Sequence, residues 1–150
     1  MFAVGVVLAL ATPTAAAQDN QQVRGSGFYE DPNAPACPTA PSGFDSYPAL
    51  VISGNLEGCW YTKVLTAKST PSGVYIETGE ELFVGTLDGE AGTFTTTYKF
   101  ESKFASDFTE IHGRCQHPIV GGTGVFADAT GIIHFKDAPP EFFYRGHISL

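Results

Sequence analysis

The chain has 150 residues, which is enough for one domain of ordinary size. Its formal net charge is −8, and its eight Lys and Arg residues are scattered rather than clustered. Nucleic-acid binding needs clustered basic side chains, so this composition excludes DNA or RNA as a partner. An acidic balance of this size is typical of a surface whose charge serves solubility.

Residues 1–17 indicate a secretory signal peptide. They carry no charge and are nearly all apolar or small, although no Lys or Arg precedes the apolar stretch. That stretch, residues 2–10, is too short to span a bilayer as a helix, and Ala15-Ala16-Ala17 offers a cleavage site of the A-x-A type. We expect cleavage after Ala17 and a secreted, extracellular protein; an ordinary apolar N-terminal strand is the alternative. No later segment has the apolar length to cross a membrane, so no membrane span is predicted.

Residues 18–48 are predicted to form a Pro-rich N-terminal arm. Residues 18–27 are polar and indicate a flexible start, while residues 32–48 hold five of the ten prolines. Proline fixes φ and removes a donor from the sheet ladder, so this zone cannot be a central strand. Phe44 and Tyr47 favour docking of the later part of the arm on the domain.

From residue 49 onward, strand-like runs alternate with turns. The clearest strand is 93–104, whose even positions are mostly aromatic and whose odd positions are polar, a period of two. No window shows convincing helical periodicity. The segments predict an all-β fold, a single antiparallel, roughly eight-stranded up-and-down barrel over residues 49–150, whose last strand pairs with its first. The expected strands are 49–53, 59–68, 74–87, 93–104, 108–119, 132–136 and 141–150.

A glycine-rich segment, residues 121–131, lies between two of these strands. Its glycines can adopt positive φ and bring backbones close together. We expect Phe126 to plug one end of the barrel, with small alanines beside it. A phosphate site is excluded, because the Walker lysine is missing and the glycine spacing does not fit G-x-G-x-x-G before a helix. The residues that define the segment are Gly121, Gly122, Thr123, Gly124, Phe126 and Gly131.

The glycine-rich segment resembles the G-G-T-G-x-F-x-x-A-x-G signature of the allene oxide cyclase-like barrel superfamily, which includes the plant dirigent proteins. The resemblance extends to the hairpin at 84–94 and the strand at 131–136, and it covers roughly residues 50–150. It implies a barrel fold in a small secreted bacterial member, and it leaves the activity open. Family members include allene oxide cyclases, stereochemical guides for phenoxy radical coupling and bacterial proteins without assigned roles. No catalytic residue carries over, because no carboxylate of this chain aligns with the buried carboxylate that the plant cyclases imply.

Three cysteines imply that one thiol is left free, pairs between chains or takes part in exchange. Cys59 and Cys115 both lie in strand-like runs, and a Cys59–Cys115 disulfide is the favoured pairing. Cys37–Cys59 and Cys37–Cys115 are the alternatives. No C-x-x-C is present and the four histidines lack zinc-type spacing, so neither a metal nor a cofactor is predicted.

Polar residues that could carry chemistry are few. Alternation places Glu110, His112, Arg114 and Gln116 on one face of their strand, which we assign to solvent, with Ile111 and Cys115 facing inward. Glu77 and Glu81 share a face with apolar residues, so either is a candidate buried carboxylate. No nucleophile motif is present, and the catalytic residues are unknown.

The barrel interior is either filled by side chains or holds one small ligand. We expect a protein that encloses a small apolar molecule, and whether it is an enzyme is left open. One alternative is a cyclase or stereochemical guide for a reactive apolar intermediate; another is a structural or interaction module with a solid core. No oligomeric state is predicted. The candidates for lining a ligand cavity are Tyr61, Phe94, Tyr98, Phe100, Phe104 and Tyr144.

Overall fold

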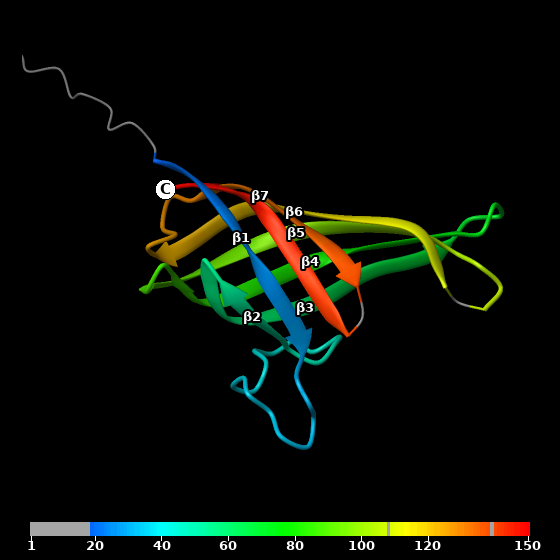
Figure 1. Ribbon diagram of the computed structural model, residues 1–150, viewed down its shortest axis with the longest axis horizontal. Coiled ribbons are helices and arrows are strands. Elements are labelled where there is room, and N and C mark those ends of the chain that lie inside the picture. The colour runs from blue at the N-terminus through cyan, green and yellow to red at the C-terminus, as the bar shows by residue number, and fades with distance from the viewer. Residues whose placement is uncertain (1–18, 108, 139) are drawn as a thin grey trace, which may run out of the picture.

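The computed structural model describes residues 19–107, 109–138 and 140–150, with the side chains of 137 and 138 left aside. The expected signal peptide lies outside these residues. Eight antiparallel strands close into one barrel in sequence order, and the described residues contain no helix, so the predicted fold class is confirmed (Figure 1). The strands are β1 Asn20–Tyr29, β2 Leu50–Gly54, β3 Leu56–Ser69, β4 Val74–Leu87, β5 Glu90–Phe104, β6 Glu110–Gly124, β7 Thr130–Ala138 and β8 Glu141–Ser149.

The barrel begins earlier than the sequence indicates. β1 lies within the expected flexible arm and pairs with β8 on one side and β2 on the other, which closes the sheet. Its inward positions are Val23, Gly25 and Gly27, so it lacks the apolar alternation that identifies a strand. Gly25 is required for close approach, because a Cβ there would lie 2.5 Å from the Tyr144 hydroxyl. The boundary of the domain at residue 49 is therefore corrected to Asn20.

The later part of the arm, from Cys37 onward, packs as expected against the outer face of β2 and β3. The Tyr61 hydroxyl donates to the Pro38 carbonyl at 3.0 Å, and the Ser46 amide donates to the Thr62 carbonyl at 3.0 Å. A Cys37–Cys59 disulfide fastens the arm to β3.

The favoured Cys59–Cys115 pairing is wrong, and an alternative pairing is present. On β3 the side chain of Trp60 faces the interior, so its neighbour Cys59 faces the arm outside. Cys115 lies on the interior side of β6 and forms no disulfide. The barrel wall separates these two sulfur atoms, and Cys37 is the partner within reach of Cys59.

The glycine-rich segment closes one end of the barrel. Phe126 is fully buried, and its ring packs edge-to-face against Phe94 at a centroid distance of 4.9 Å. Gly122 makes room for this turn, because a Cβ there would lie 2.4 Å from the Phe126 carbonyl oxygen. Phe126 thus lies in the packed core at this end of the barrel.

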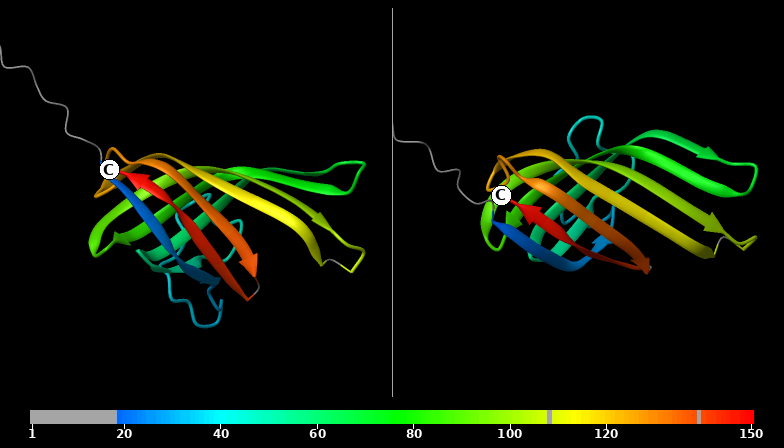
Figure 2. Two further views of the ribbon diagram at one scale, coloured as in Figure 1. Left: turned by 45° about the horizontal axis from the view of Figure 1, so that its top comes forward. Right: turned by 90° about the horizontal axis from the view of Figure 1, so that it is seen from above.

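At the opposite end, the β3–β4 and β5–β6 hairpins run past the rim of the barrel (Figure 2). Ile111 lies in this extension and is exposed, so its expected inward position is wrong. The barrel therefore has a packed end and an open end.

Candidate functional site

The open half of the barrel contains a pocket of about 710 Å³. This volume is in the range of small-molecule sites. The interior is thus packed around Phe83, Phe94 and Phe126 and hollow beyond them, so it is not a solid core throughout. Eight aromatic side chains contribute to the wall of the pocket: Tyr29, Tyr47, Trp60, Tyr98, Phe100, Phe104, Phe135 and Phe142.

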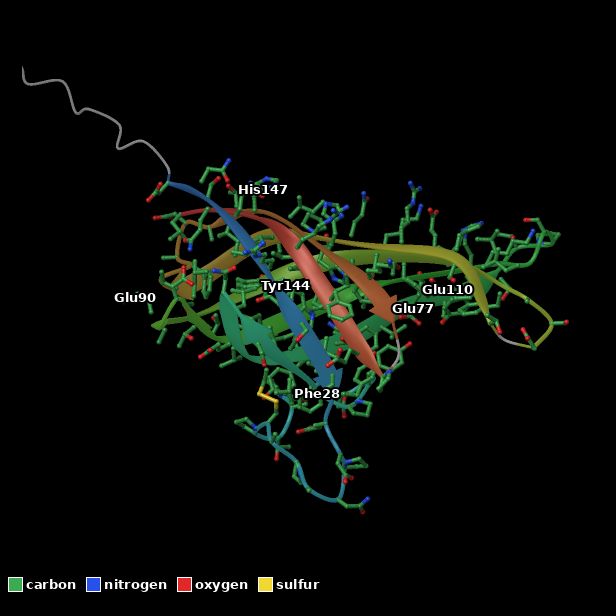
Figure 3. The ribbon with its side chains drawn as sticks, viewed as in Figure 1. Phe28, Glu77, Glu90, Glu110, Tyr144 and His147 are labelled. Atoms are coloured by element: carbon green, nitrogen blue, oxygen red, sulfur yellow. A yellow bond between two sulfur atoms is a disulfide. The ribbon has the colours of Figure 1, made fainter. Side chains whose placement is uncertain are left out.

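Two carboxylates from β4 also line the pocket, and both are 5% exposed. Glu77 and Glu81 lie four residues apart on the face that also carries Phe83, as strand alternation requires. Figure 3 places Glu77 in the same half of the molecule as Glu110 and far from Glu90, which marks the closed end. A buried carboxylate is costly without hydrogen-bond donors, so the partners of each define the site.

Three tyrosine hydroxyls converge on Glu77. The Tyr98 hydroxyl donates to Oε1 at 2.7 Å, while Tyr47 and Tyr75 donate to Oε2 at 2.7 and 2.6 Å. Tyr47 belongs to the arm, so the outer segment contributes directly to the pocket.

These contacts hold the three phenols in their neutral form. Burial, followed by the hydrogen bond to Glu77, raises the pKa of Tyr98 and of Tyr47 far above the ordinary value. For Tyr75 the hydrogen bond to Glu77 is the larger cause of the raised pKa. The tyrosines therefore act as hydrogen-bond donors, and they do not become phenolate bases near neutral pH.

Glu81 forms a second polar cluster deeper in the barrel. Its Oε2 accepts a hydrogen bond from the Thr96 hydroxyl at 2.8 Å and contacts Nδ1 of His117 at 2.5 Å. All three residues are buried, and His117 is 4% exposed. A Glu81–Thr96–His117 layer thus separates the packed aromatic end from the pocket.

The His117 ring is held on several sides by aromatic side chains. Trp60 and Phe135 meet it edge-to-face at centroid distances of 5.7 and 4.9 Å, and Tyr98 stacks on it at 6.0 Å. A ring packed in this way keeps one orientation. Its Nδ1 is therefore fixed toward Glu81.

The other ring nitrogen of His117 is left open. Nε2 is buried and has no hydrogen-bond partner among the residues that the structure describes. An ionised Glu81 only accepts hydrogen bonds, so the proton of a neutral imidazole belongs on Nδ1 and Nε2 carries a lone pair. The pocket wall thus contains a buried acceptor that lacks a donor.

A register shift follows His117 in β6. Thr95 pairs with Gly121 and Thr96 pairs with Ile119, so Val120 is an extra residue in β6. Before the bulge, Cys115, His117 and Ile119 share the interior side by ordinary strand alternation, and the bulge changes the phase only beyond Ile119.

The predicted cavity residues divide into three groups. Tyr98, Phe100 and Phe104 line the pocket. Phe94 and Tyr144 lie in the packed core, where the Tyr144 hydroxyl accepts a hydrogen bond from the Leu56 amide at 2.9 Å. Tyr61 lies under the arm, outside the barrel wall, so its expected place in the cavity is corrected.

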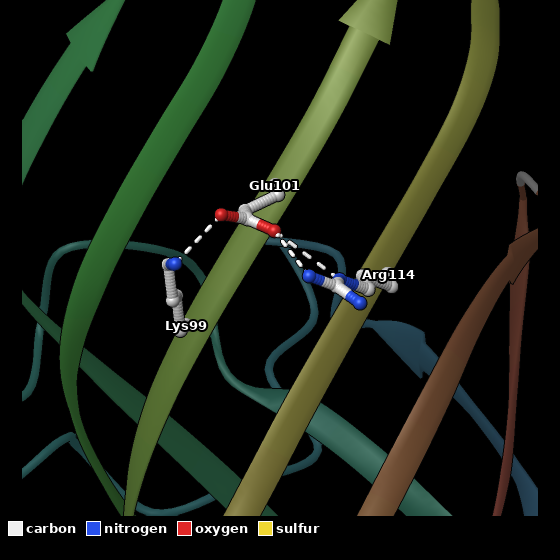
Figure 4. A network of polar contacts seen from close by, with 3 residues as sticks. All are labelled: Lys99, Glu101 and Arg114. Carbon is white, nitrogen blue, oxygen red and sulfur yellow. Dashed lines mark hydrogen bonds and ion pairs between the residues drawn. The ribbon is translucent and has the colours of Figure 1, made fainter.

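The charged face of β6 points outward as expected. Arg114 donates to Glu101 on β5 at 2.8 Å, and Lys99 contacts the other oxygen of the same carboxylate at 2.6 Å (Figure 4). Hydrogen bonds from Lys99 first and Arg114 second lower the pKa of Glu101. This network stabilises charges on the surface and contributes nothing to the pocket. Glu110 is exposed at the pocket rim.

Sequence reasoning identified the buried glutamates but missed His117, Trp60 and Tyr47 as pocket residues. His117 has the same parity as Cys115, which was expected to face inward, so alternation contained the signal. Trp60 and Tyr47 depend on the orientation of β3 and on the docking of the arm, which no local pattern specifies.

The chain matches no known protein-family model, no curated protein sequence and no solved structure. In the described ranges, no cluster of three or more His, Cys, Asp or Glu side chains is arranged to hold a metal ion. The same ranges contain no helix long and apolar enough to cross a membrane.

Proposed function

We propose that the protein binds a small, neutral, mostly apolar molecule in the open half of the barrel. The observation that carries this proposal is a pocket of about 710 Å³ with aromatic walls and one unpartnered acceptor, His117 Nε2. A ligand that donates one hydrogen bond to Nε2 would remove the cost of leaving that buried atom unpaired. Its remaining surface would be covered by aromatic side chains.

The charge of the site selects against anions. Glu77, Glu81 and Glu110 all line the pocket, which has no Lys or Arg among its lining residues. The chain as a whole carries a net charge of −8. A carboxylate or phosphate on the ligand would be repelled, so alcohols, phenols and similar neutral donors fit best.

A second candidate is a cyclase or stereochemical guide that encloses a reactive apolar intermediate and fixes its conformation. The inward carboxylates Glu77 and Glu81 favour it. The signature at residues 121–131 supports, as part of this proposal, membership in the allene oxide cyclase-like superfamily.

We also infer export, which the Cys37–Cys59 disulfide supports because such bonds persist in oxidising compartments.

The single tryptophan, Trp60, is a natural reporter of binding, because it is buried and lines the pocket. Nitroaromatic ligands quench indole fluorescence at short range, so saturable quenching measures occupancy. We expect 4-nitrobenzyl alcohol to bind more tightly than its methyl ether, which lacks the donor, by roughly five- to tenfold. The anion 4-nitrophenylacetate should bind most weakly.

Tightest binding by the anion, or no saturable quenching by any of the three compounds, would contradict the proposal. The exposed-face variant His112→Gln is the control, because His112 is exposed and lies outside the pocket lining. It should leave the three affinities in the same order.

A further inference from the structure

The pocket contains several groups that could accept a proton. They differ in whether a hydrogen-bond donor or water already occupies them. Both oxygens of Glu77 are occupied by phenol donors, and Oε2 of Glu81 is occupied by Thr96 and His117. Glu110 is exposed to water at the rim, outside the buried part of the pocket. Within the described residues of the deep pocket, Nε2 of His117 is the nitrogen lone pair without a partner.

The geometry around His117 is that of a base held by an orienting group. Glu81 Oε2 lies 2.5 Å from Nδ1, within hydrogen-bonding distance. A carboxylate in this position fixes the tautomer and stabilises the imidazolium that forms when Nε2 takes a proton. Thr96 donates to the same oxygen and holds the carboxylate in place.

The pair is buried in the wall of the pocket. His117 and Glu81 are each at most 5% exposed, and the ring is packed against Trp60, Tyr98 and Phe135. In such a site the imidazolium that forms needs an adjacent opposite charge, and the Glu81 carboxylate is in place to supply it. A buried, unpaired polar atom is also costly, so an inert core would be expected to use an apolar residue here.

We propose that His117 and Glu81 form an acid–base dyad that moves a proton within a bound neutral ligand, which makes the protein a proton-transfer isomerase. His117 is the catalytic base and Glu81 is its positioning residue. This inference rests on the proposed binding of a neutral apolar molecule and deepens it. The substrate class is a conjugated or carbonyl compound with an activated C–H group.

The step balances without a co-reactant. Nε2 takes a proton from the C–H group adjacent to the carbonyl, and the electron pair of that bond moves into the π system of the ligand. The imidazolium then returns the proton to a different carbon of the same ligand, so a double bond changes position. No oxidant, reductant or leaving group is involved, and the dyad ends in its starting protonation state.

The test uses 5-nitrobenzisoxazole, a neutral aromatic probe whose ring opens when a base removes its single activated C–H proton. The electron pair of the C–H bond forms the nitrile, the N–O bond breaks, and a coloured phenolate leaves. We expect saturable turnover by the full chain and a loss of about a hundredfold or more in kcat for His117→Gln. Deuterium at the reacting carbon should slow the wild-type reaction severalfold.

Glu81 is tested by the conservative pair Glu81→Gln and Glu81→Asp. As a positioning residue, it should change kcat by at least about tenfold in Glu81→Gln with little change in KM, and Glu81→Asp should recover part of the loss. His112→Gln, an exposed histidine on the same strand, should match the wild type. If His117→Gln does not fold, competition by 4-nitrobenzyl alcohol must still abolish turnover in the wild-type protein.

The outcomes separate the two levels of the proposal. Saturable quenching of Trp60 by the probe without turnover would overturn the dyad and leave ligand binding intact. Turnover that survives in folded His117→Gln, or that resists competition, would also overturn it. Absence of binding by every neutral aromatic probe would contradict the binding function and the dyad together.

Discussion

Among the residues that the structure describes, His117 has a hydrogen-bond partner at Nδ1 and none at Nε2. An unsatisfied buried polar atom costs roughly 1–3 kcal/mol, a sizeable share of the stability of a small domain. Thr96, Glu81 and His117 occupy interior positions that apolar side chains of similar size could fill. The packing of the fold alone therefore does not require these polar residues.

Substitution of this layer tests whether it serves folding. Glu81→Met alone should lower the free energy of unfolding by about 3 kcal/mol, because it removes the partner of buried His117. The triple variant Glu81→Met, Thr96→Val, His117→Phe should return to within about 1 kcal/mol of wild type or exceed it. Urea denaturation followed by Trp60 fluorescence measures both. A triple variant less stable than Glu81→Met would show that the layer is structural.

At the scale of elements, the sequence predicts most of the strands of the barrel. It does not predict the register shifts that change which side chains face inward. Alternation in β4 and β5 identifies the buried glutamates and the aromatic wall correctly, because each of these strands keeps one face inward. β1 was not predicted as a strand, because glycines occupy two of its inward positions. The bulge at Val120 was not predicted either, because no local sequence pattern specifies a register shift. The disulfide was mispredicted for a related reason, since the orientation of Cys59 depends on where the arm docks.

The arm is expected to act as a tether for part of the pocket wall. The Cys37–Cys59 bond closes a loop with a sequence separation of 22, and removing it through Cys37→Ser and Cys59→Ser should cost about 3 kcal/mol in the chain-entropy model. It should also loosen Tyr47, which reaches Glu77 from the arm. Denaturation and Trp60 quenching measure the two effects.

Tyr47→Phe provides the comparison for that variant. It removes the hydrogen bond to Glu77 but keeps the disulfide, so it should weaken ligand binding with a smaller loss of stability. Unchanged affinity in the double serine variant would contradict a role of the arm in the pocket.

On the scale of the whole molecule, the packed apolar core lies at one end of the barrel and the polar pocket lies at the other. The packed end buries Phe83, Phe94 and Phe126 in contact, while the open end keeps its polar groups inside an incomplete core. Burial of Tyr98 at the boundary links the two, because above pH 10 its hydroxyl remains neutral only while the barrel is folded. Global unfolding and tyrosine ionisation are therefore coupled.

This coupling predicts alkaline sensitivity. Burial raises the pKa of Tyr98 above its ordinary value of 10.0, so the stabilisation is complete below pH 10 and is lost as the pH rises further. Above pH 10, Tyr98 should contribute a decline of up to about 1.4 kcal/mol per pH unit in the free energy of unfolding. Tyrosinate absorbance should rise together with the loss of far-ultraviolet circular dichroism. In Tyr98→Phe the decline should be shallower, and an identical slope would contradict this assignment.

Because Phe126 fills the packed end of the barrel, the pocket is open only at the opposite end. A ligand that enters through the open end of the barrel therefore has to leave through the same end. The barrel then restricts the width of the ligand's head but not the length of its tail, which can trail into solvent. A homologous series of ligands with lengthening chains should gain affinity only until the chain clears the rim, after which each added methylene changes nothing.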